Sequence, residues 1–388
     1  MSPSDAATIR RGRPEDVEKI LDLLAFYERP RGYFDPFYSK DPTYRPEHSW
    51  IAERDGRPLA HLRVFDRTIR VGEAELRVAA VGNVITAPDQ RGRGHAGRLL
   101  DAMLAEIPGE GFAYSLLRAY RPALYERHGW APIGEEVVRA ELPPFGPGSV
   151  SIEPFGEHDL PEVMRLYEET NAGRSGPAIR PPEYWHGQLE WLEEDRGGFL
   201  VARRRSGTLA GYVRSRTRED AAEILELGIR AGDVGVGRAL LLAAAGRRGN
   251  RIRANLPPSL RGLVIPTEGE LVEEFALMGR VIDPEALVAA LEPAWLRRME
   301  TSGSRGGSFR LSTRAGTAEV RASFSGVRVY RQETEGVRTS LGERAFAHLL
   351  LRGFDAAAGE RVGTVRDPSL LAALFPEQDF VVWRADAF

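Results

Sequence analysis

Residues 86–100 read TAPDQRGRGHAGRLL, a basic, glycine-rich turn that leads into an apolar-periodic segment. Glycines let the backbone curl so that successive N–H groups point into one concavity. From Ala96 to Ile107 the apolar residues recur with the 3.6-residue period of a helix. A helix N-terminus carries about half a positive charge, and Arg91 and Arg93 add their own charges. The stretch therefore predicts a strand–turn–helix unit with an anion site at the start of the helix.

Two known anion-binding turns compete for this stretch. Its three glycines fit the G-x-G-x-x-G spacing of dinucleotide-binding folds, but the strand predicted at 81–86 ends several residues before the first of them. The next apolar stretch ends at Arg118, where a dinucleotide site has an acidic residue. Gln90–Gly94 instead fits the Q/R-x-x-G-x-G/A turn that holds the pyrophosphate of an acyl-coenzyme A (acyl-CoA). The sequence thus favours acyl-CoA, with an ordinary basic surface turn as the remaining alternative.

An internal repeat extends this pattern over the first 290 or so residues. Two copies show the same order of a short strand, an acidic segment, a helix, a hairpin and a strand–turn–helix unit. The matching pairs are 8–23 with 151–166, 50–60 with 200–210, and 81–106 with 223–242. A tandem duplication of one α/β domain is the simplest explanation, and the Pro/Gly-rich stretch 143–148 marks the linker. The second turn, 230–237, lacks the arginine pair and carries Asp233, so we expect an anion site only in the first copy.

Chain length and the pattern of the C-terminal part indicate a third domain. A chain of 388 residues exceeds one ordinary core. Residues 308–331 alternate apolar and polar positions as antiparallel strands do, and residues 343–354 and 369–375 have helical patterns. We therefore predict an α/β (α+β) protein with domains at 1–145, 146–288 and 289–388.

Composition excludes several classes of function. The sequence has no cysteine, which removes disulfides, thiolate zinc sites and cysteine nucleophiles. A formal net charge of −3 gives no general attraction to nucleic acid or anionic membranes. The N-terminal segment lacks the apolar run of a signal peptide, and no window approaches the ~20 apolar residues of a spanning helix. The seven histidines show no metal-ligand spacing. We expect a soluble cytoplasmic protein without a metal, nucleic-acid or membrane partner.

The patterns described so far resemble the GNAT acetyltransferase superfamily, in which the same order of elements and the same turn occur. The tandem copy and the third domain resemble, more narrowly, the enhanced-intracellular-survival (Eis-like) family. This resemblance implies two tandem GNAT domains, the second degenerate, each a mixed, mostly antiparallel sheet flanked by helices, and a C-terminal domain similar to sterol carrier proteins. It also implies acetyl-CoA as the co-substrate. The residues implied at the cofactor site are Val84, Ile85, Thr86, Arg91, Gly92, Arg93, Gly94, His95, Ala96, Gly97, Tyr120 and Arg121.

Residues 124–130 read LYERHGW and match the family's Y-x-R-F-G-Y/W segment. In the family the tyrosine protonates the departing CoA thiolate, and Tyr125 is at that position. A phenol is mostly protonated at neutral pH and can donate to a thiolate; a tyrosine buried for packing alone is the alternative. His128 replaces an apolar residue and is a weaker catalytic candidate. Tyr120 and Arg121 replace a small residue and an acid, so bulk and charge at this edge differ from the family pattern.

Residues 380–388 read FVVWRADAF, in which apolar residues alternate up to the last one, whereas most termini are polar and frayed. In the family the C-terminal carboxylate enters the N-terminal active site as general base, and the resemblance assigns that role to Phe388. Desolvation in a closed pocket would raise the pKa of this carboxylate and make it a better base. Asp386 is the competing base, and an edge strand that simply ends at Phe388 is the structural alternative.

These features together predict an N-acetyltransferase in which an amine attacks the thioester of acetyl-CoA directly. The Phe388 carboxylate takes the amine proton, a backbone N–H near Ile85 stabilises the oxyanion, and Tyr125 returns a proton to sulfur. The family resemblance implies an aminoglycoside (hence antibiotic resistance), another polyamine or a lysine side chain as acceptor, and a homohexamer. Two alternatives stay open, namely a non-catalytic acyl-CoA-sensing or lipid-binding protein and a GNAT enzyme with a longer acyl donor.

Aromatic residues follow the first predicted helix, at 26–27 and within 33–37. In GNAT domains this region shapes the acceptor pocket, and these side chains would suit an amphipathic amine. Simple packing of a loop explains them equally well, so the sequence leaves their role open.

Overall fold

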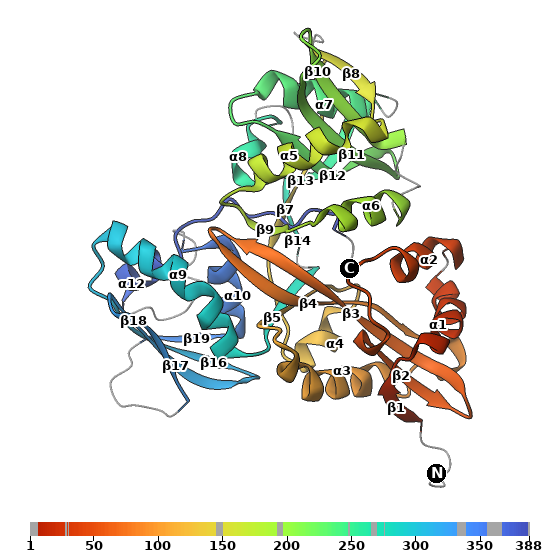
Figure 1. The fold of residues 1–388 in the computed structure, drawn as a ribbon, viewed down its shortest axis with the longest axis vertical. Helices are drawn as coiled ribbons and strands as arrows, with labels where there is room; N and C mark the ends of the chain where they lie inside the picture. Colours follow the sequence, from red (N-terminus) through yellow and green to blue (C-terminus); the bar gives the residue numbers. More distant parts are fainter. Residues whose placement is uncertain are drawn as a thin grey trace.

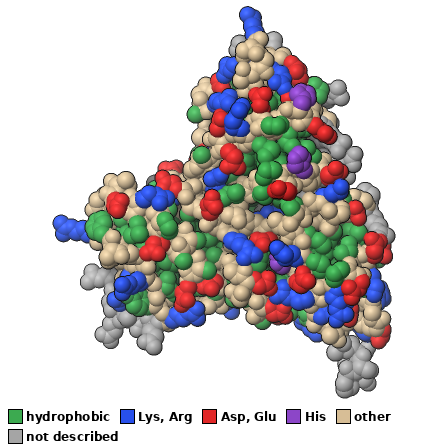
Figure 2. Space-filling model, viewed as in Figure 1, with side chains coloured by type: hydrophobic (Ala, Val, Ile, Leu, Met, Phe, Trp, Pro, Cys, Tyr) green, Lys and Arg blue, Asp and Glu red, His purple; other side chains and the backbone are tan. Residues whose placement is uncertain are grey.

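The computed structural model describes residues 7–27, 29, 31–144, 150–191, 197–246, 249–264, 270–274, 276–331, 339–354 and 367–386. In this part of the chain, sheets of eight, seven and four strands form the centres of three lobes (Figure 1). Acidic and basic side chains are interspersed over the face shown in Figure 2, in keeping with the small net charge. The mixed α/β class predicted from the sequence is confirmed.

The first sheet holds the candidate site. Its strands are β1 (Thr8–Arg11), β2 (Ser49–Arg54), β3 (Arg57–Val71), β4 (Ala74–Thr86), β5 (Tyr114–Arg118), β6 (Ala131–Pro132), β9 (Ser175–Ala178) and β15 (Leu277–Val281). The strand order is β1–β2–β3–β4–β5–β15–β6, and β9 pairs with the far end of β3. Within this sheet β4 and β5 run parallel and the other pairs run antiparallel.

Helices cover both faces of the first sheet. They are α1 (Val17–Leu24), α2 (Arg31–Ser39), α3 (His95–Glu106) and α4 (Pro122–Arg127), with 3-10 turns η2 (Pro14–Asp16), η3 (Ala25–Tyr27), η4 (Pro46–His48), η5 (Pro88–Gln90) and η6 (Ile107–Glu110). Successive side chains of a strand point to opposite faces, and β4 shows the result. Ala79 and Val81 lie in the core beneath α3, whereas Ala80 lies in the core beneath α1 and α2. The helix predicted from the period at 96–107 is therefore confirmed as α3.

The second sheet repeats this plan. Its strands are β7 (Glu135–Glu141), β8 (Val150–Pro154), β10 (Phe199–Arg204), β11 (Leu209–Arg218), β12 (Ala221–Ile229), β13 (Arg251–Asn255) and β14 (Glu270–Glu274). Its helices are α5 (Leu160–Asn171), α6 (Pro182–Trp191), α7 (Val234–Ala245) and α8 (Pro258–Arg261), with the 3-10 turn η7 (Glu157–Asp159). Strands β12 and β13 are parallel neighbours, as β4 and β5 are in the first sheet.

The two sheets exchange strands where the sequence predicts a domain boundary. Strand β7 lies between β13 and β14 of the second sheet, and β15 lies between β5 and β6 of the first. Neither sheet is therefore built from one continuous range of residues. The limits at 145 and 288 stay a prediction, and residues 145–148 of the predicted linker lie outside the described residues.

The third lobe is the four-stranded sheet with its helices. The elements are β16 (Gly307–Thr313), β17 (Gly316–Ser323), β18 (Gly326–Tyr330), β19 (Ser340–Gly342), α9 (Pro284–Ser302), α10 (Glu343–Arg352) and α12 (Pro368–Leu374). One apolar core joins this lobe to the first sheet, because Trp295 and Phe346 share it with Leu76 and Tyr114. None of the helices in the described ranges combines the length and apolar character that a membrane span needs. The likeness to sterol carrier proteins stays a prediction.

The segment that follows α12 runs between the lobes. Phe380 forms a β-bridge with Ser175 of β9, and the Val381 N–H donates to the Ser175 carbonyl over 2.9 Å. Its side chains then alternate between two cores, with Val382 in the core of the third lobe and Trp383 in that of the second. The apolar character of this segment thus reflects burial between lobes.

A buried carboxyl group lies where the third lobe meets the first sheet. Glu343, the first residue of α10, accepts a hydrogen bond from the Val281 N–H of β15 over 2.5 Å. Burial raises the pKa of Glu343 to about 7, although the Val281 N–H and the nearby Arg280 oppose the rise. Between pH 4.5 and 7 the folded chain therefore binds more protons here than the unfolded chain does, so this group's contribution to stability falls as pH rises.

Replacing Glu343 by glutamine should therefore stabilise the protein at pH 8 and leave it nearly unchanged at pH 5. The amide oxygen can still accept from Val281, while the cost of a buried charge disappears. We expect a gain of about 1 kcal/mol at pH 8, which corresponds to a rise of roughly two degrees in Tm. Thermal unfolding of both proteins at the two pH values measures this. An equal shift at pH 5 and pH 8 would contradict the assignment.

Candidate active site

The parallel strands β4 and β5 separate at one end. They pair from Val78 opposite Tyr114 to Val81 opposite Leu117. Strand β5 ends at Arg118, whereas β4 continues to Thr86. Residues 82–86 of β4 therefore have an edge that no strand in the described part of the chain covers.

A bulge shapes this part of β4. Asn83 has a φ of 50°, and the register with β3 shifts between His61 and Arg63. The backbone carbonyl of Asn83 contacts His61 Nδ1 at 3.0 Å, and the side-chain amide of Asn83 donates to the Tyr38 hydroxyl over 3.1 Å. Burial lowers the pKa of His61 to about 3, so the ring is uncharged. The bulge is thus held by neutral groups, which fix the backbone that follows it.

The hydrogen bonds beyond the bulge show which groups face the free edge. The Ala87 N–H donates to the Leu59 carbonyl of β3 over 2.8 Å. Because backbone groups alternate between the two sides of a strand, those of Ile85 also face β3, and its side chain is buried beneath α1 and α2. The amides and carbonyls of Val84 and Thr86 face the free edge, where an extended ligand could bind as an added strand.

The turn after β4 has the geometry of an anion site. Gly92 and Gly94 both have a φ of 77°, which glycine adopts without strain. A Cβ added at either position would meet no atom within 4 Å, so the turn is open to a ligand. Gly94 is the N-cap of α3, and Arg91 and Arg93 are exposed beside it. The turn therefore fits a pyrophosphate held by amides and by the helix N-terminus.

The first residue of α3, His95, is buried. Burial, followed by the nearby Arg98, lowers the pKa of His95, so its ring is neutral at pH 7. Neither ring nitrogen has a hydrogen-bond partner within the described ranges. His95 and the half-buried Ala96 thus support the turn from the protein side, and their predicted role at the cofactor stays a prediction.

Gly97 and His128 connect α3 to α4. A Cβ on Gly97 would lie 3.4 Å from the His128 ring, so glycine permits this close approach. His128 Nδ1 contacts the Leu124 carbonyl at 2.8 Å, and Nε2 contacts the Asp101 carboxylate at 3.3 Å. These contacts explain His128 as a packing residue that fixes α4 relative to the turn.

Tyr125 lies on α4 beside the separated strands. Its ring is 6.2 Å from that of Trp130 in an edge-on arrangement. Trp130 Nε1 donates to Ser115 Oγ over 3.2 Å, and Ser115 donates to the Ala79 carbonyl of β4 over 2.7 Å. Burial raises the pKa of the Tyr125 phenol to about 12, yet its hydroxyl bonds to no group in the described part of the chain. The phenol is therefore protonated at neutral pH and able to donate to a ligand.

Aromatic residues after α1 divide into two groups. Phe34, Phe37 and Tyr38 are residues of α2 that are buried in the core shared by α1, α2 and the sheet, so packing explains them. Phe26 and Tyr27 are exposed, and the Tyr27 hydroxyl donates to the Val84 carbonyl over 2.6 Å. The sequence suggests either an acceptor pocket or loop packing for these residues and gives no signal for this contact, which joins positions 57 residues apart.

Tyr120 and Arg121 precede α4 and are exposed. Tyr120 leaves 99% of its surface in solvent, so it has no packing role in the described structure. The structure therefore keeps both residues available at the end of β5, and their role at the cofactor stays a prediction.

The chain end approaches this region through Asp386. Asp386 is buried, and each of its carboxylate oxygens accepts from Arg180, at 2.8 and 2.9 Å. The Tyr184 hydroxyl also donates to it over 3.4 Å, and Tyr184 belongs to the same apolar cluster as Ile85. The ion pair with Arg180 occupies Asp386, which makes it a poor candidate for the base. Phe388 lies outside the described residues.

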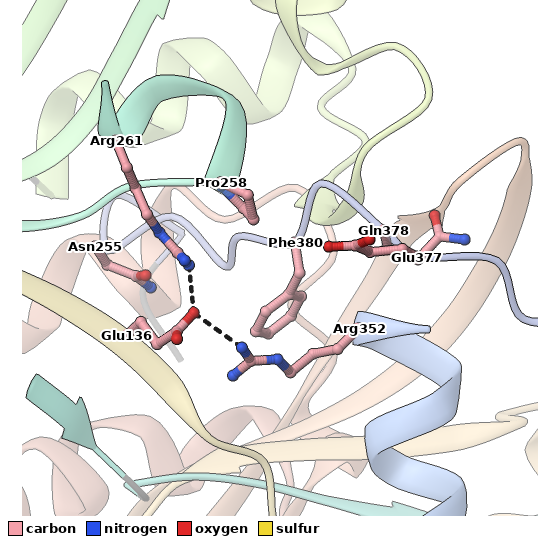
Figure 3. Close-up of a pocket in the computed structure, with 8 residues that line it drawn as sticks. All are labelled: Glu136, Asn255, Pro258, Arg261, Arg352, Glu377, Gln378 and Phe380. Carbon is pink, nitrogen blue, oxygen red and sulfur yellow. Dashed lines mark hydrogen bonds and ion pairs between the residues drawn. The ribbon is translucent and has the colours of Figure 1, made fainter. Parts of the chain in front are cut away.

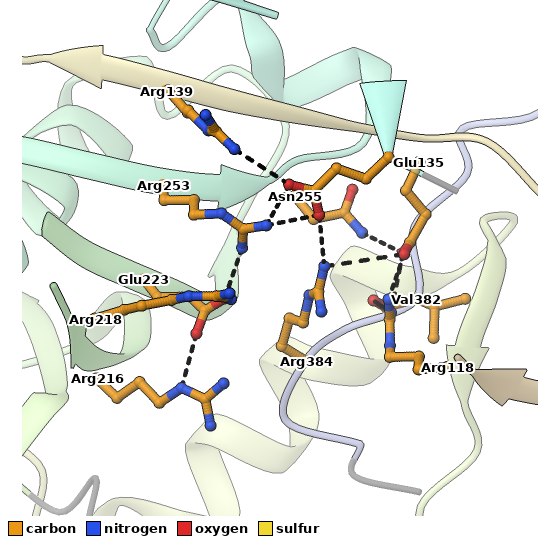
Figure 4. A network of polar contacts seen from close by, with 11 residues as sticks. Arg118, Glu135, Arg139, Arg216, Arg218, Glu223, Arg253, Asn255, Val382 and Arg384 are labelled. Carbon is orange, nitrogen blue, oxygen red and sulfur yellow. Dashed lines mark hydrogen bonds and ion pairs between the residues drawn. The ribbon is translucent and has the colours of Figure 1, made fainter. Parts of the chain in front are cut away.

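A network of polar contacts connects the end of β5 to the segment that follows α12 (Figure 4). Arg118 forms an ion pair with the buried Glu135 and donates to the Val382 carbonyl over 3.0 Å. Arg384 lies 3.5 Å from Glu274 in this network. The sequence gives no signal for this network, because no local pattern connects Arg118 with Val382, which lies 264 residues later.

The second copy differs at both matching positions. Its turn carries Asp233, which accepts from Arg204 over 2.8 Å, and α8 carries Arg261 where α4 carries Tyr125. Arg261 forms an ion pair with Glu136 at 2.5 Å.

Arg261 and Glu136 line a cavity of about 180 Å³ between the lobes, which is also lined by Arg352 and Phe380 (Figure 3). A second cavity of about 530 Å³ lies beside the Asp233 turn. No group of metal-ligating side chains is found among the described residues.

Comparison with known proteins identifies the family. Residues 8–133 match the family model described as an acetyltransferase (GNAT) domain. A UPF0039 protein of Mycobacterium tuberculosis is 31% identical over 149 residues, which is 35% of this chain and 92% of that protein. An uncharacterized N-acetyltransferase of Streptomyces coelicolor is 29% identical over 185 residues, 43% of this chain and 45% of that protein. The chain therefore belongs to the GNAT acetyltransferase family, which implies acyl-CoA-dependent N-acetyltransferase activity.

Solved structures extend the likeness in fold over nearly the whole chain. A GCN5-related N-acetyltransferase of Kribbella flavida aligns with a TM-score of 0.71 at 16% identity, covering 97% of this chain and 98% of that chain. Eis1 of Mycobacterium abscessus aligns with a TM-score of 0.66 at 19% identity, covering 97% and 99%. At these identities the likeness concerns the fold alone, so membership of the Eis-like family stays a proposal.

Proposed function

We propose that the protein transfers an acetyl group from acetyl-CoA to a primary amine of an acceptor, in a ternary complex and without a covalent enzyme intermediate. The observation that carries this proposal is the free edge of β4 at residues 82–86, which continues into the open glycine turn at 92–97. An edge strand suits the pantetheine amides, and the turn suits the pyrophosphate. Tyr125 stands beside the separated strands, on the helix that His128 fixes to α3.

In the proposed reaction the amine nitrogen attacks the thioester carbon, and the carbon–sulfur bond breaks. A backbone N–H on the free edge of β4 stabilises the oxyanion. The departing thiolate takes its proton from Tyr125, which enters the reaction protonated because its pKa is about 12. The proton lost by the attacking amine passes to the base. No metal or covalent carrier is needed for this balance.

The base we propose is the Phe388 carboxylate, since both oxygens of Asp386 accept hydrogen bonds from Arg180. Appending one glycine after Phe388 would displace the carboxylate by up to ~3.5 Å, and we expect kcat to fall by about tenfold. Phe388→Leu, which keeps the carboxylate in place, is the matched control. Steady-state kinetics with acetyl-CoA measures both variants. Unchanged kcat in the extended protein would exclude this base.

The proposed acceptors are aminoglycosides, other polyamines and lysine side chains, and we propose a homohexamer as the assembly. The test incubates the protein with acetyl-CoA and a panel of these amines, and follows thiol release together with the mass of the acetylated product. Release that depends on one amine supports the proposal. Binding of CoA without release for any amine would instead favour an acyl-CoA-sensing protein, and faster release from longer acyl-CoAs would identify a different donor.

A further inference from the structure

The free edge of β4 is already occupied at one position. The Tyr27 hydroxyl donates to the Val84 carbonyl over 2.6 Å. The alternation fixed by the Ala87–Leu59 hydrogen bond directs this carbonyl toward the free edge and away from β3. Tyr27 therefore satisfies an acceptor that an added strand would otherwise use.

A ligand that binds as an added strand needs the same carbonyl. The pantetheine arm of acyl-CoA contains two amide groups, and their N–H groups can donate only to carbonyls that face the free edge. In the described part of β4 beyond the bulge, these are the carbonyls of Val84 and Thr86. A carbonyl oxygen has two lone pairs, but the Tyr27 hydroxyl lies 2.6 Å from the Val84 oxygen on the side of the free edge. A pantetheine N–H has to approach from that same side, so the two donors compete for the same space.

The surroundings of Tyr27 allow it to leave. It lies at the end of η3 with 37% of its surface exposed, and its ring contacts Phe34 at a centroid distance of 5.8 Å. Partial burial, followed by the nearby phenols of Tyr125 and Tyr120, raises the pKa of Tyr27 above its usual value. The hydroxyl is therefore a permanent donor, and rotation of one side chain toward solvent frees the Val84 carbonyl.

We propose that the Tyr27 hydroxyl is a built-in competitor of acyl-CoA, holding the Val84 carbonyl in the free protein until a pantetheine amide displaces it. This inference rests on the proposed function, because it assumes that acyl-CoA binds along β4. Its consequence is that removing one hydroxyl tightens coenzyme binding, whereas removal of a residue that contacts the coenzyme weakens it.

The test compares Tyr27→Phe with the unaltered protein by calorimetric titration of two ligands. One is CoA, and the other is adenosine 3′-phosphate 5′-diphosphate, the nucleotide half of CoA without pantetheine. A net hydrogen bond contributes about 0.5–1.5 kcal/mol, so the Kd for CoA should fall by about 2- to 10-fold in the variant. The Kd for the nucleotide half should stay the same, and Tyr330→Phe, on β18 of the third lobe, should leave both values unchanged.

The outcomes separate this inference from the proposed function. Equal or weaker CoA binding by Tyr27→Phe would overturn the competition, while leaving acyl-CoA binding in place. A parallel change for both ligands would also overturn it, since the effect would then not concern pantetheine. Failure of the unaltered protein to bind CoA would overturn the proposed function as well. A crystal structure with CoA gives a second readout, because a Tyr27 hydroxyl still bonded to Val84 would contradict displacement.

Discussion

Replacing Tyr125 by phenylalanine is expected to lower kcat for acetyl transfer by about 100-fold, because a positioned general acid contributes about 10²–10⁴ to a rate. The phenyl ring keeps the edge-on contact with Trp130, so the fold and the affinity for acetyl-CoA should stay within about twofold. Thiol release measures kcat, and calorimetry with CoA measures binding. Tyr330→Phe in the third lobe controls for loss of a phenol elsewhere and should retain full activity.

The pH dependence provides an independent check of the same assignment. A general acid is active while protonated, so its contribution is lost as pH rises through its pKa. Burial raises the pKa of Tyr125 to about 12, so kcat should show no decline from this group up to about pH 10. A decline of kcat near pH 8 that disappears in Tyr125→Phe would contradict a pKa of about 12 for Tyr125. Full activity in Tyr125→Phe would show that Tyr125 is not the general acid.

The parts of this site that the sequence predicts are those that lie within one short stretch. The turn at 92–97 follows from residues next to one another, where glycine and proline restrict the backbone and apolar spacing marks the helix. Tyr125 is assigned through the resemblance of residues 124–130 to a family segment, which is also one short stretch. The anion site needs only a turn and a helix start, and both are local. The structure places them as the sequence indicates, with Gly94 as the N-cap of α3.

The parts that the sequence does not predict depend on distant pairings. No pattern in the sequence singles out β15, whose five residues are all buried, and nothing local selects its partners. Its place between β5 and β6 is therefore visible only in the structure. The side of β4 that Val84 faces depends on the bulge at Asn83, which one positive φ creates. The contact between Tyr27 and Val84 depends on both the bulge and the path of the chain after α1.

The second large effect is expected from Gly94→Val. Gly94 has a φ of 77°, where a β-branched residue is strained by about 1–3 kcal/mol. An added Cβ meets no atom within 4 Å, so the variant should fold, but the turn will relax and its amides will no longer converge on one anion. We expect the Kd for CoA to rise by about 30-fold, equivalent to roughly 2 kcal/mol, as measured by calorimetry.

The duplicated domain supplies the matched control for this prediction. Gly232 lies in the equivalent turn before α7, with a φ of 85° and no atom within 4 Å of an added Cβ. Gly232→Val therefore introduces the same backbone strain beside Asp233, whose carboxylate is held by Arg204. Because an anion is not expected there, CoA binding should not change in Gly232→Val, whereas the unfolding temperature should fall in both variants. Weakened CoA binding in Gly232→Val, or normal binding in Gly94→Val, would show that the pyrophosphate is not held at the start of α3.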